Sequence, residues 1–588
     1  MDHNQPDTRR PRGWALLASR NRLILATAFW LLAASNWPFW RAVWQGVGGL
    51  REGNGLFLLT LPLFVLSWLF LLLSLLAWGR LTKPVLALAL LVSAAASYFM
   101  NSYGIVIDQS MLANLVQTDT AEATELLSWK LAAWLLGFGV LPVLLISRVP
   151  LVPGSWKGEL GRKALGMVVA TACLGGVAFS QYQPYASLLR NHHELRLMLV
   201  PSNVVAAVQS YAKRQLATPT QLTPVGTDAH RLVPVSASRR PRLTILVVGE
   251  TARAANFSLD GYARDTNPEL SKRGVLSFSQ ASSCGTATAV SVPCMFLDVG
   301  QHGYKDGLAK SREGLLDVLQ RAGVAVLWRD NNSGCKGVCD RVPHEDVDHL
   351  HVAELCRSDE CYDEILLHDL QAYLDKQQDD TVVVLHMKGS HGPAYFKRYP
   401  PAFERFTPVC DSNQLDRCDR QSIVNAYDNS LTYTDHVLAQ TIDLLAHNQQ
   451  RFDSAMLYMS DHGESLGENG IYLHGLPYAM APAEQTHIPM LLWLSDGLAR
   501  SAAIDTDCLQ QEREHAFSHD NLFHSVLGLM NVQTNAYQAG KDLFRLCQPA
   551  GGGGKGVWGA MEPKTNVSSE SHRKGAFRSP AHPPGITL

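Results

Sequence analysis

The most constraining feature of this sequence is a series of long apolar runs in its first third. Leu56–Gly79 and Pro84–Ile107 each hold 24 residues without an Asp, Glu, Lys or Arg. A helix of about 20 apolar residues crosses the hydrocarbon core of a bilayer. Residues 23–44, 131–147 and 164–182 are apolar over most of their length. Five membrane-spanning helices are therefore predicted, with a buried soluble helix as the alternative for each of the last two runs.

The basic residues predict the orientation of these helices. They cluster before the first run, between the second and third, and between the fourth and fifth, at Arg9, Arg10, Arg12, Arg20, Arg22, Arg80, Lys83, Arg148, Lys157, Arg162 and Lys163. Loops rich in Lys and Arg stay in the cytoplasm. Residues 1–22 are therefore expected inside the cell, and an odd number of spans places the chain after about residue 183 on the opposite side of the membrane.

The cysteines agree with that orientation. Ten of the eleven follow the apolar runs, and only Cys173 precedes Cys284. An even number in close pairs predicts disulfides in an oxidising compartment, with structural zinc sites as the alternative. The predicted pairs are Cys284 with Cys294, Cys335 with Cys339, Cys356 with Cys361, Cys410 with Cys418, and Cys508 with Cys547.

The second half of the chain alternates short β-branched runs with helical stretches. The predicted strands are 242–249, 324–328, 381–387, 455–460 and 489–495, and the predicted helices are 314–322, 363–376 and 423–447. This alternation is typical of an α/β fold with a mostly parallel sheet. The predicted organisation is a cytoplasmic N-terminus at 1–22, a transmembrane domain at 23–185, a bridging helix and linker at 186–240, an α/β domain at 241–549 and a disordered tail at 550–588.

Two predicted strands are followed directly by residues that bind metals. Glu250 follows the strand 242–249, and Asp461 and His462 follow the strand 455–460. Active sites of parallel sheets lie at the carboxyl ends of the strands, so these residues are expected to meet. For Glu250 alone, a helix N-cap is the alternative. Two carboxylates and an imidazole favour a divalent metal, with zinc preferred by the histidine and manganese less favoured.

A candidate nucleophile lies in the segment SSCGTATAVSVPCMF. Its hydroxyl residues are Ser282, Ser283, Thr286, Thr288 and Ser291. A helix that begins inside this segment would aim backbone N–H groups at an anion. A metal ion lowers the pKa of a threonine hydroxyl and polarises a phosphoryl oxygen. Spacing alone does not choose between Thr286 and Thr288.

Several long motifs together resemble one family. VVGETARAANFSLDGYARDTNPEL, CGTATAVSVPCMF, DNNSGCKGVCD, HMKGSHGPAY and SDHGESLGENGIYLHGLP are similar to segments of the lipid A phosphoethanolamine transferases. That family includes the mobile colistin-resistance enzymes and belongs to the alkaline phosphatase/sulfatase superfamily. The resemblance extends to about Cys547 and implies a five-helix transmembrane domain followed by a sulfatase-like catalytic domain.

The resemblance also implies roles for individual residues. Thr288 would be the nucleophile, and Glu250, Thr288, Asp461 and His462 would bind one zinc ion, with a second zinc as an open alternative. His391 and His474 match positions that bind the substrate phosphate, a second zinc or the leaving group. Asn332 and Lys336 match positions near the donor head group, and His487 is a weaker candidate.

A polar stripe follows the third apolar run. Asn114, Thr118 and Glu122 are spaced i, i+4, i+8, so they share one helix face. A solvated helix face is the alternative. In the family the equivalent face turns towards the lipid head group, which implies that Glu122 holds an ethanolamine ammonium.

The implied activity is transfer of phosphoethanolamine from phosphatidylethanolamine to a phosphate of lipid A through a threonine-bound intermediate. The added cation would weaken polymyxin binding. The chain would be a monomer in the inner membrane of a Gram-negative bacterium, with its catalytic domain in the periplasm. Its charge of −2 gives no reason to expect nucleic acid as a partner. The alternatives are transfer to core heptose or periplasmic glucan, a phosphoglycerol transferase, a hydrolase, or a non-catalytic membrane sensor.

Overall fold

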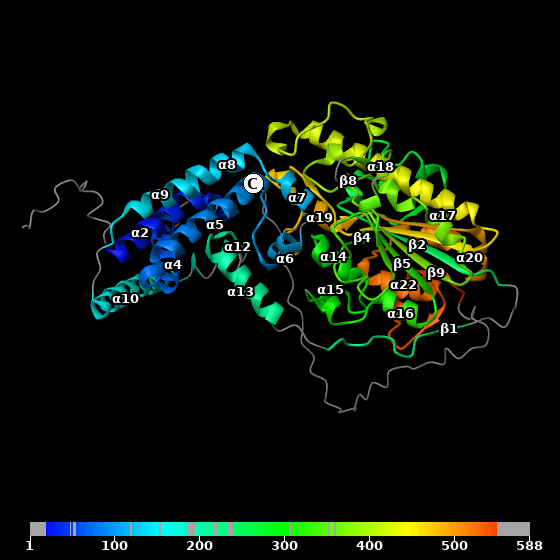
Figure 1. The fold of residues 1–588 in the computed structure, drawn as a ribbon, viewed down its shortest axis with the longest axis horizontal. Helices are drawn as coiled ribbons and strands as arrows, with labels where there is room; N and C mark the ends of the chain where they lie inside the picture. The colour runs from blue at the N-terminus through cyan, green and yellow to red at the C-terminus, as the bar shows by residue number, and fades with distance from the viewer. Residues whose placement is uncertain are drawn as a thin grey trace, which may run out of the picture. The chain divides into compact units, whose positions relative to one another are not determined.

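The computed structural model describes residues 19–549, apart from residues 48, 51–54, 118–119, 152–154, 183, 186–187, 189–194, 217–220, 233–238, 306, 351 and 358–359. The predicted tail at 550–588 and most of the predicted cytoplasmic N-terminus lie outside the described residues. The described chain begins with a helical region and continues into a region built around a β-sheet (Figure 1).

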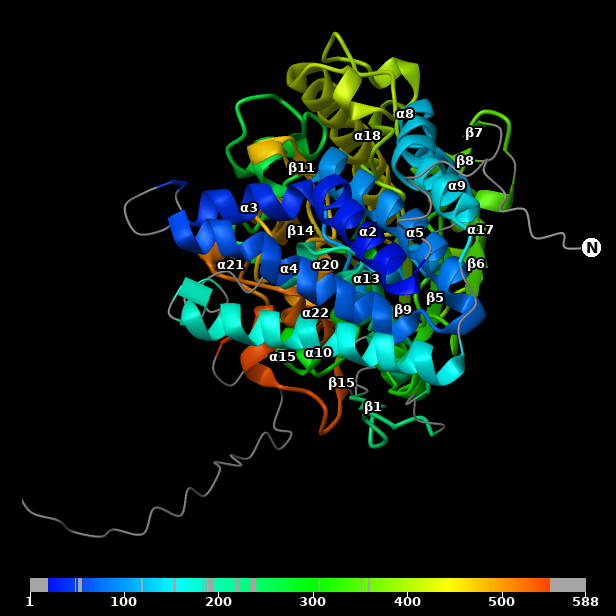
Figure 2. The ribbon, with the colours of Figure 1, turned by 90° about the vertical axis from the view of Figure 1, so that its left-hand side faces the viewer.

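Within the described residues, four helical segments are long and apolar enough to cross a membrane. They are α4 (Gly55–Leu76), η2 with α5 (Gly79–Tyr103), α8 with η3 and α9 (Trp129–Arg148), and α10 (Trp156–Ser180). α4 packs against α10 and against α2 (Arg20–Trp30) (Figure 2). Four of the predicted spans therefore correspond to helices long and apolar enough to cross a membrane, and the predicted count of five depends on the first run.

The first apolar run forms a bent pair of helices. Its segments Arg20–Ser35 and Trp37–Gln45 are inclined by 61° to one another. The buried Asn36 lies at the bend, where its side-chain amide donates to the carbonyl oxygens of Leu31 and Val200. Pro38 follows and has no backbone N–H to continue the helical hydrogen bonding. The run is therefore either one broken span or a re-entrant segment.

A seven-stranded sheet forms the centre of the second region. Its strand order is β3-β14-β10-β2-β9-β5-β6. The bounds are β2 Arg242–Gly249, β3 Leu276–Ser277, β5 Ala325–Asp330, β6 His344–Asp346, β9 Thr381–His386, β10 Asp453–Ser460 and β14 Met490–Leu494. β10, β2, β9, β5 and β6 pair in parallel, as the alternation of strands and helices predicts.

The strand predicted at 489–495 is present but runs opposite to its neighbour, and one predicted helix is broken. The run at 489–495 forms β14, which pairs antiparallel with β10 and makes the sheet mixed. The helix predicted at 363–376 is broken into η9 (Asp363–Leu367) and α17 (Leu370–Leu374). The break falls at Asp369, whose φ of +57° is left-handed and cannot continue a right-handed helix.

Helices cover both faces of the sheet. α17 and α18 (Arg420–His447) lie on one face, and α16 (Leu315–Arg321) and α22 (Leu522–Leu529) lie on the other (Figure 1). β2 serves both layers because Leu246 and Val248 pack with α16 and α22, whereas Ile245 and Val247 pack with α17 and α18. Burial on both faces explains why this strand reads as a continuous apolar run.

The helical region and the sheet region share buried contacts. Tyr98, Tyr103 and Ile105 belong to the same apolar cluster as Ile245 of β2. The short helix α6 (Gln109–Gln117) packs against α14 (Thr288–Met295) of the sheet region and against α13 (Ser202–Leu216).

Five disulfides link the ten cysteines of the second region. They join Cys284 to Cys294, Cys335 to Cys339, Cys356 to Cys361, Cys410 to Cys418 and Cys508 to Cys547. Cys173 is the one cysteine of the described chain outside a disulfide. Pairing of all ten thiols leaves none to form the alternative zinc sites.

Candidate active site

Two neighbouring strand ends bring the metal-binding candidates together. β2 and β10 are parallel and in register, with Gly249 opposite Ser460, so Glu250 and Asp461 emerge at the same edge of the sheet. Thr251 has a left-handed φ of +53°, which is uncommon for a residue with a Cβ and is typical of functional sites. Its backbone N–H donates to Asp461 Oδ1 at 3.2 Å.

His462 completes a group of three possible ligands. Its Nε2 lies 3.5 Å from Glu250 Oε1 and 3.2 Å from Asp461 Oδ2, and all three side chains are buried. One ligand atom of each residue lies within 4.8 Å of the others. His462 Nδ1 is 3.0 Å from the carbonyl oxygen of Gly463, which can only accept. The ring proton therefore sits on Nδ1, and the Nε2 lone pair faces the carboxylates.

The electrostatics of this group fit a divalent cation. Glu250 Oε1 and Asp461 Oδ2 are buried and have no hydrogen-bond partner. Burial and the neighbouring Asp461 raise the pKa of Glu250, and burial raises the pKa of Asp461 to about 6. Burial and the neighbouring His474 lower the pKa of His462 to about 4, which keeps this ring neutral. A bound cation would satisfy both orphaned oxygens and relieve the repulsion between the carboxylates.

Thr288 is the first residue of α14 and points into this group. Its Oγ1 donates to Glu250 Oε2 at 3.0 Å and lies 3.4 Å from His462 Nε2. The disulfide between Cys284 and Cys294 closes a ring that contains Thr288 and the start of the helix. The backbone N–H groups of a helix N-terminus favour an anion such as a phosphate at this position.

Two of the other candidate nucleophiles donate to carbonyl oxygens outside this group. Thr286 Oγ1 donates to the carbonyl oxygen of Leu476 at 2.5 Å, and Ser283 Oγ donates to the carbonyl oxygen of Gly285 at 2.6 Å. Ser282 lies in the small strand β4 (Ala281–Ser282), and Ser291 is fully buried within α14. Contacts between distant segments thus distinguish Thr288 from Thr286, which spacing in the sequence cannot do.

Two further histidines lie beside His462. The ring centroids of His474 and His462 are 4.3 Å apart, and those of His391 and His474 are 5.5 Å apart. His474 Nδ1 is 2.8 Å from Glu464 Oε2, which fixes the ring. The structure therefore brings both predicted histidines to the site, each less than 9% exposed.

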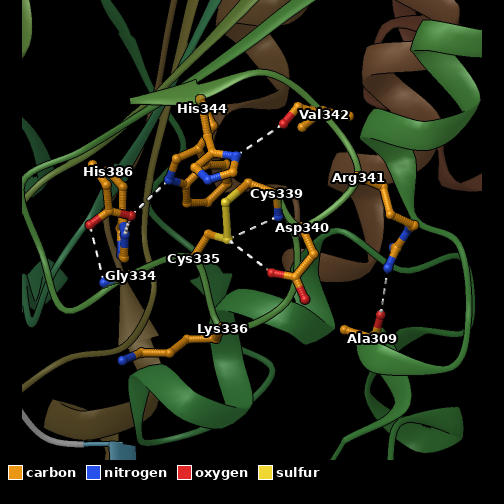
Figure 3. The surroundings of a disulfide bond; sticks show 12 residues. Ala309, Gly334, Cys335, Lys336, Cys339, Asp340, Arg341, Val342, His344 and His386 are labelled. Atoms are coloured by element: carbon orange, nitrogen blue, oxygen red, sulfur yellow. Dashed lines mark hydrogen bonds and ion pairs between the residues drawn. A yellow bond between two sulfur atoms is a disulfide. The ribbon is translucent and has the colours of Figure 1, made fainter. Parts of the chain in front are cut away.

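Asn332 reaches the same cluster from the carboxyl end of β5. Its side-chain amide donates to Glu250 Oε2 at 2.9 Å and to the carbonyl oxygen of Met387 at 2.8 Å. Lys336 extends away from the ring closed by Cys335 and Cys339 (Figure 3). Its Nζ donates to the carbonyl oxygen and to the hydroxyl of Ser333, both at 2.7 Å.

The weaker candidate His487 has a structural role. Its Nε2 is 2.7 Å from the carbonyl oxygen of Ser279, and the residue lies in β13 (His487–Ile488), which pairs with β4. The strand pairing and the contact between the imidazole and Ser279 both stabilise the segment that precedes Thr288.

The predicted polar stripe is only partly described. Asn114 lies on α6, and α6 packs against α14. Met111, on the same helix, packs against Gly475, the residue that follows His474. A Cβ added at Gly475 would lie 2.8 Å from Met111 Cε. Thr118 lies outside the described residues, as does the side chain of Glu122 within α7 (Thr120–Glu125).

Three residues at the site are not predicted from the sequence to have a role. Glu464 accepts from the Tyr395 hydroxyl at 2.6 Å and holds His474, and burial raises its pKa to about 7. Asp330 and His386 form a buried pair, with Oδ2 and Nδ1 2.9 Å apart. Burial alone would raise the pKa of Asp330, but His386 lowers it to about 2. Both residues end strands, the same positional signal that identifies Glu250.

A mixed sheet with this cluster at its parallel strand ends defines a member of the alkaline phosphatase/sulfatase superfamily. The sulfatase family model matches residues 242–532. A second model, described as phosphoethanolamine transferase EptA/EptB, matches residues 65–216 of the helical region. The chain belongs to the EptA/EptB phosphoethanolamine transferase family, as the relatives below also show.

The similarity to named relatives extends over most of the chain. Phosphoethanolamine transferase EptA of Escherichia coli strain K12 is 45% identical over 528 residues, 89% of this chain and 96% of that protein. Phosphatidylethanolamine transferase Mcr-1 of E. coli is 40% identical over 526 residues, 87% of this chain and 94% of that protein. The solved structure of the integral membrane protein lipooligosaccharide phosphoethanolamine transferase A from Neisseria meningitidis matches with a TM-score of 0.87 and 39% identity, over 90% of this chain and 98% of that chain.

Proposed function

We propose that this chain transfers phosphoethanolamine from phosphatidylethanolamine to a phosphate of lipid A, through a phosphoethanolamine intermediate on Thr288. The observation that carries the proposal is the hydroxyl of Thr288 at a helix N-terminus, 3.0 Å from Glu250 in a buried cluster of possible metal ligands. Membership of the transferase family supports the transferred group, and a relative named for lipooligosaccharide supports the acceptor.

Zinc is the proposed metal, and Glu250, Thr288, Asp461 and His462 are its proposed ligands. A neutral imidazole with two carboxylates is a donor set that zinc prefers, with manganese less favoured. When bound, zinc would lower the pKa of the Thr288 hydroxyl and offset negative charge on the phosphoryl oxygens. A second zinc beside His391 and His474 stays an open alternative.

The proposed reaction has two transfer steps, and different residues act in them. In the first step the Thr288 hydroxyl releases its proton to solvent, and its oxygen then attacks phosphorus. The bond to the glycerol oxygen breaks, and diacylglycerol leaves with a proton. His391 and His474 are proposed to hold the phosphoryl group or to donate that proton. In the second step a phosphate oxygen of lipid A attacks the same phosphorus, and the Thr288 oxygen leaves. Asn332 steadies Glu250, and Lys336, Asn114, Thr118 and Glu122 are proposed to contact the donor head group.

The proposed setting is the inner membrane of a Gram-negative bacterium. The bent pair in the first apolar run counts as the first of five spans, within a transmembrane domain at 23–185. Residues 186–240 connect it to the catalytic domain at 241–549, which lies in the periplasm, and the chain acts as a monomer. Five disulfides in the sheet region support an oxidising compartment.

This orientation predicts the result of a reporter fusion. Alkaline phosphatase fused after residue 190 is expected to be active, because that enzyme requires export and disulfide formation. Fusion after residue 81, between the second and third spans, is the matched control and is expected to be inactive. Activity of the second fusion, or inactivity of the first, would contradict the five-span topology.

Mass spectrometry of lipid A tests the proposed function. Lipid A from Gram-negative cells that express the chain is expected to gain a phosphoethanolamine group, and the cells are expected to tolerate more polymyxin. An empty vector is the control. The increment on core heptose or on periplasmic glucan instead would change the acceptor, and a phosphoglycerol increment would change the donor. No increment on any of these, with the protein present and loaded with zinc, would overturn the transferase proposal.

A further inference from the structure

Arg398 is a buried charged residue with no role in the steps above. It follows the short helix η10 (Tyr395–Lys397), and its side chain is 3% exposed. Nε donates to the carbonyl oxygen of His391 at 2.8 Å, Nη1 to Glu360 Oε2 at 2.9 Å and Nη2 to Glu125 Oε2 at 2.7 Å. One guanidinium therefore ties together three segments that are far apart in the sequence.

The contact with His391 brings this guanidinium to the edge of the active site. The loop 387–392 that carries His391 packs directly on Glu250, whose carbonyl oxygen accepts from the backbone N–H of Ser390 at 3.0 Å. Gly389 has a φ of +53°, and a Cβ there would stand 2.5 Å from the same carbonyl oxygen. The inner part of the loop is thus fixed by close packing, and Arg398 holds its outer end.

Glu125 supplies the contact from the membrane-proximal segment. It is the last residue of α7, between the predicted third and fourth spans, and its side chain is 3% exposed. Its carboxylate also accepts from Lys397 at 2.9 Å, and its backbone carbonyl accepts from the Asn413 amide. Lys397 is 44% exposed, so its ion pair is screened by water, whereas the pair with Arg398 is not.

Glu125 is one of two carboxylates that contact the Arg398 guanidinium directly, and the buried Asp363 also stabilises its charge. The other carboxylate, Glu360, is shared with Lys388 at 3.1 Å. Burial alone would raise the pKa of Glu360, but Arg398 and Lys388 lower it to about 2. Without the charge of Glu125, Arg398 and Lys388 would share Glu360 as the one carboxylate that contacts both of them directly. The Arg398 side chain is then expected to move, and the hydrogen bond from its Nε to the carbonyl oxygen of His391 is expected to be lost.

We propose that Arg398 is a positioning residue for His391, and that Glu125 holds Arg398 in place, so that helix α7 helps to set the geometry of the active site. This inference rests on the proposed function, in which His391 contacts the substrate. An arginine is needed because its planar fork reaches two carboxylates while Nε remains for the carbonyl oxygen. Lysine carries the charge but cannot make the three contacts.

The test uses the full-length enzyme in nanodiscs that contain phosphatidylethanolamine, with lipid A as acceptor. Glu125→Gln and Arg398→Lys are each expected to lower kcat by about 10- to 100-fold, because a displacement of about 1 Å at a reacting group has an effect of this size. The double variant Glu125→Gln/Arg398→Lys is expected to lose no more than the single variants, since both break one shared contact.

A His391→Ala background separates positioning from a merely structural role. There, Glu125→Gln is expected to change kcat by less than about twofold, because its effect passes through His391. Arg321→Gln is the matched control, since Arg321 also binds a carboxylate, that of Glu313, and a backbone carbonyl, that of Val225. Melting temperature and zinc content are measured for each variant to establish folding.

The inference is overturned if Glu125→Gln has the kcat of the wild type. It is also overturned if the variant loses as much in the His391→Ala background, or if the losses of the double variant multiply. An inactive wild-type enzyme would overturn the proposed function together with this inference, whereas an active wild type with unaffected variants would overturn the inference alone.

Discussion

Replacing Thr288 by alanine is expected to lower the transfer rate of the purified full-length enzyme by about 10³- to 10⁶-fold. The substitution removes the hydroxyl that lies 3.0 Å from Glu250, and the hydroxyl of Thr286 donates instead to the carbonyl oxygen of Leu476. The measurement is the rate of diacylglycerol release from phosphatidylethanolamine. Intact-mass analysis of the protein is expected to find the phosphoethanolamine adduct on the wild type and none on the variant.

Two neighbouring substitutions make this prediction specific. Thr286→Ala removes a hydroxyl of the same loop that donates to the carbonyl oxygen of Leu476, and it is expected to keep most of the activity. Thr288→Ser keeps a hydroxyl at the reacting position and is expected to keep measurable activity. An active Thr288→Ala enzyme, or an adduct that maps to Thr286, would show that the nucleophile is assigned wrongly.

Loss of a metal ligand is expected to have the second large effect. Glu250→Gln removes one negative charge from the proposed zinc site, and zinc binding is expected to weaken by more than about 100-fold. Because burial raises the pKa of Asp461 to about 6, zinc affinity of the wild type is expected to fall as pH decreases through 6. Only the ionised carboxylate is a ligand, so protons compete with the metal below that value. Atomic emission spectrometry of the dialysed protein measures the zinc content.

Chelation of the wild type provides the complementary experiment. Removal of the metal is expected to abolish transfer, and added Zn²⁺ is expected to restore it where Mg²⁺ does not. Glu345→Gln is the matched control for the Glu250→Gln variant, because this glutamate of β6 is 52% exposed and pairs with Arg329. Full activity of a chelated enzyme without bound metal would contradict the zinc proposal.

The strands of the sheet are largely predictable because they are buried on both faces. β2, β9 and β10 read as continuous apolar runs, and the alternation with helices indicates their parallel order. The direction of β14 is not predictable in this way, because an apolar run has the same composition in either direction. The structure shows that β14 pairs antiparallel with β10.

The candidate site is predictable where strand ends position a residue. Glu250 and Asp461 follow two such ends, and neighbouring parallel strands bring them together. The choice of Thr288 over Thr286, by contrast, depends on a hydrogen bond to Leu476, 190 residues further along the chain. The contact of Glu125 with Arg398 joins residues separated by 273 positions, and no local pattern in the sequence encodes it.

The disulfide between Cys284 and Cys294 has a consequence for when and where the enzyme matures. The ring it closes contains Thr288, the proposed nucleophile, so this residue is expected to reach its fixed position only after two thiols have been oxidised. A newly made chain on the reducing side of the membrane meets the same phospholipid but lacks this closure. If the proposed function holds, activity is expected to depend on the ability of the host cell to oxidise these two thiols.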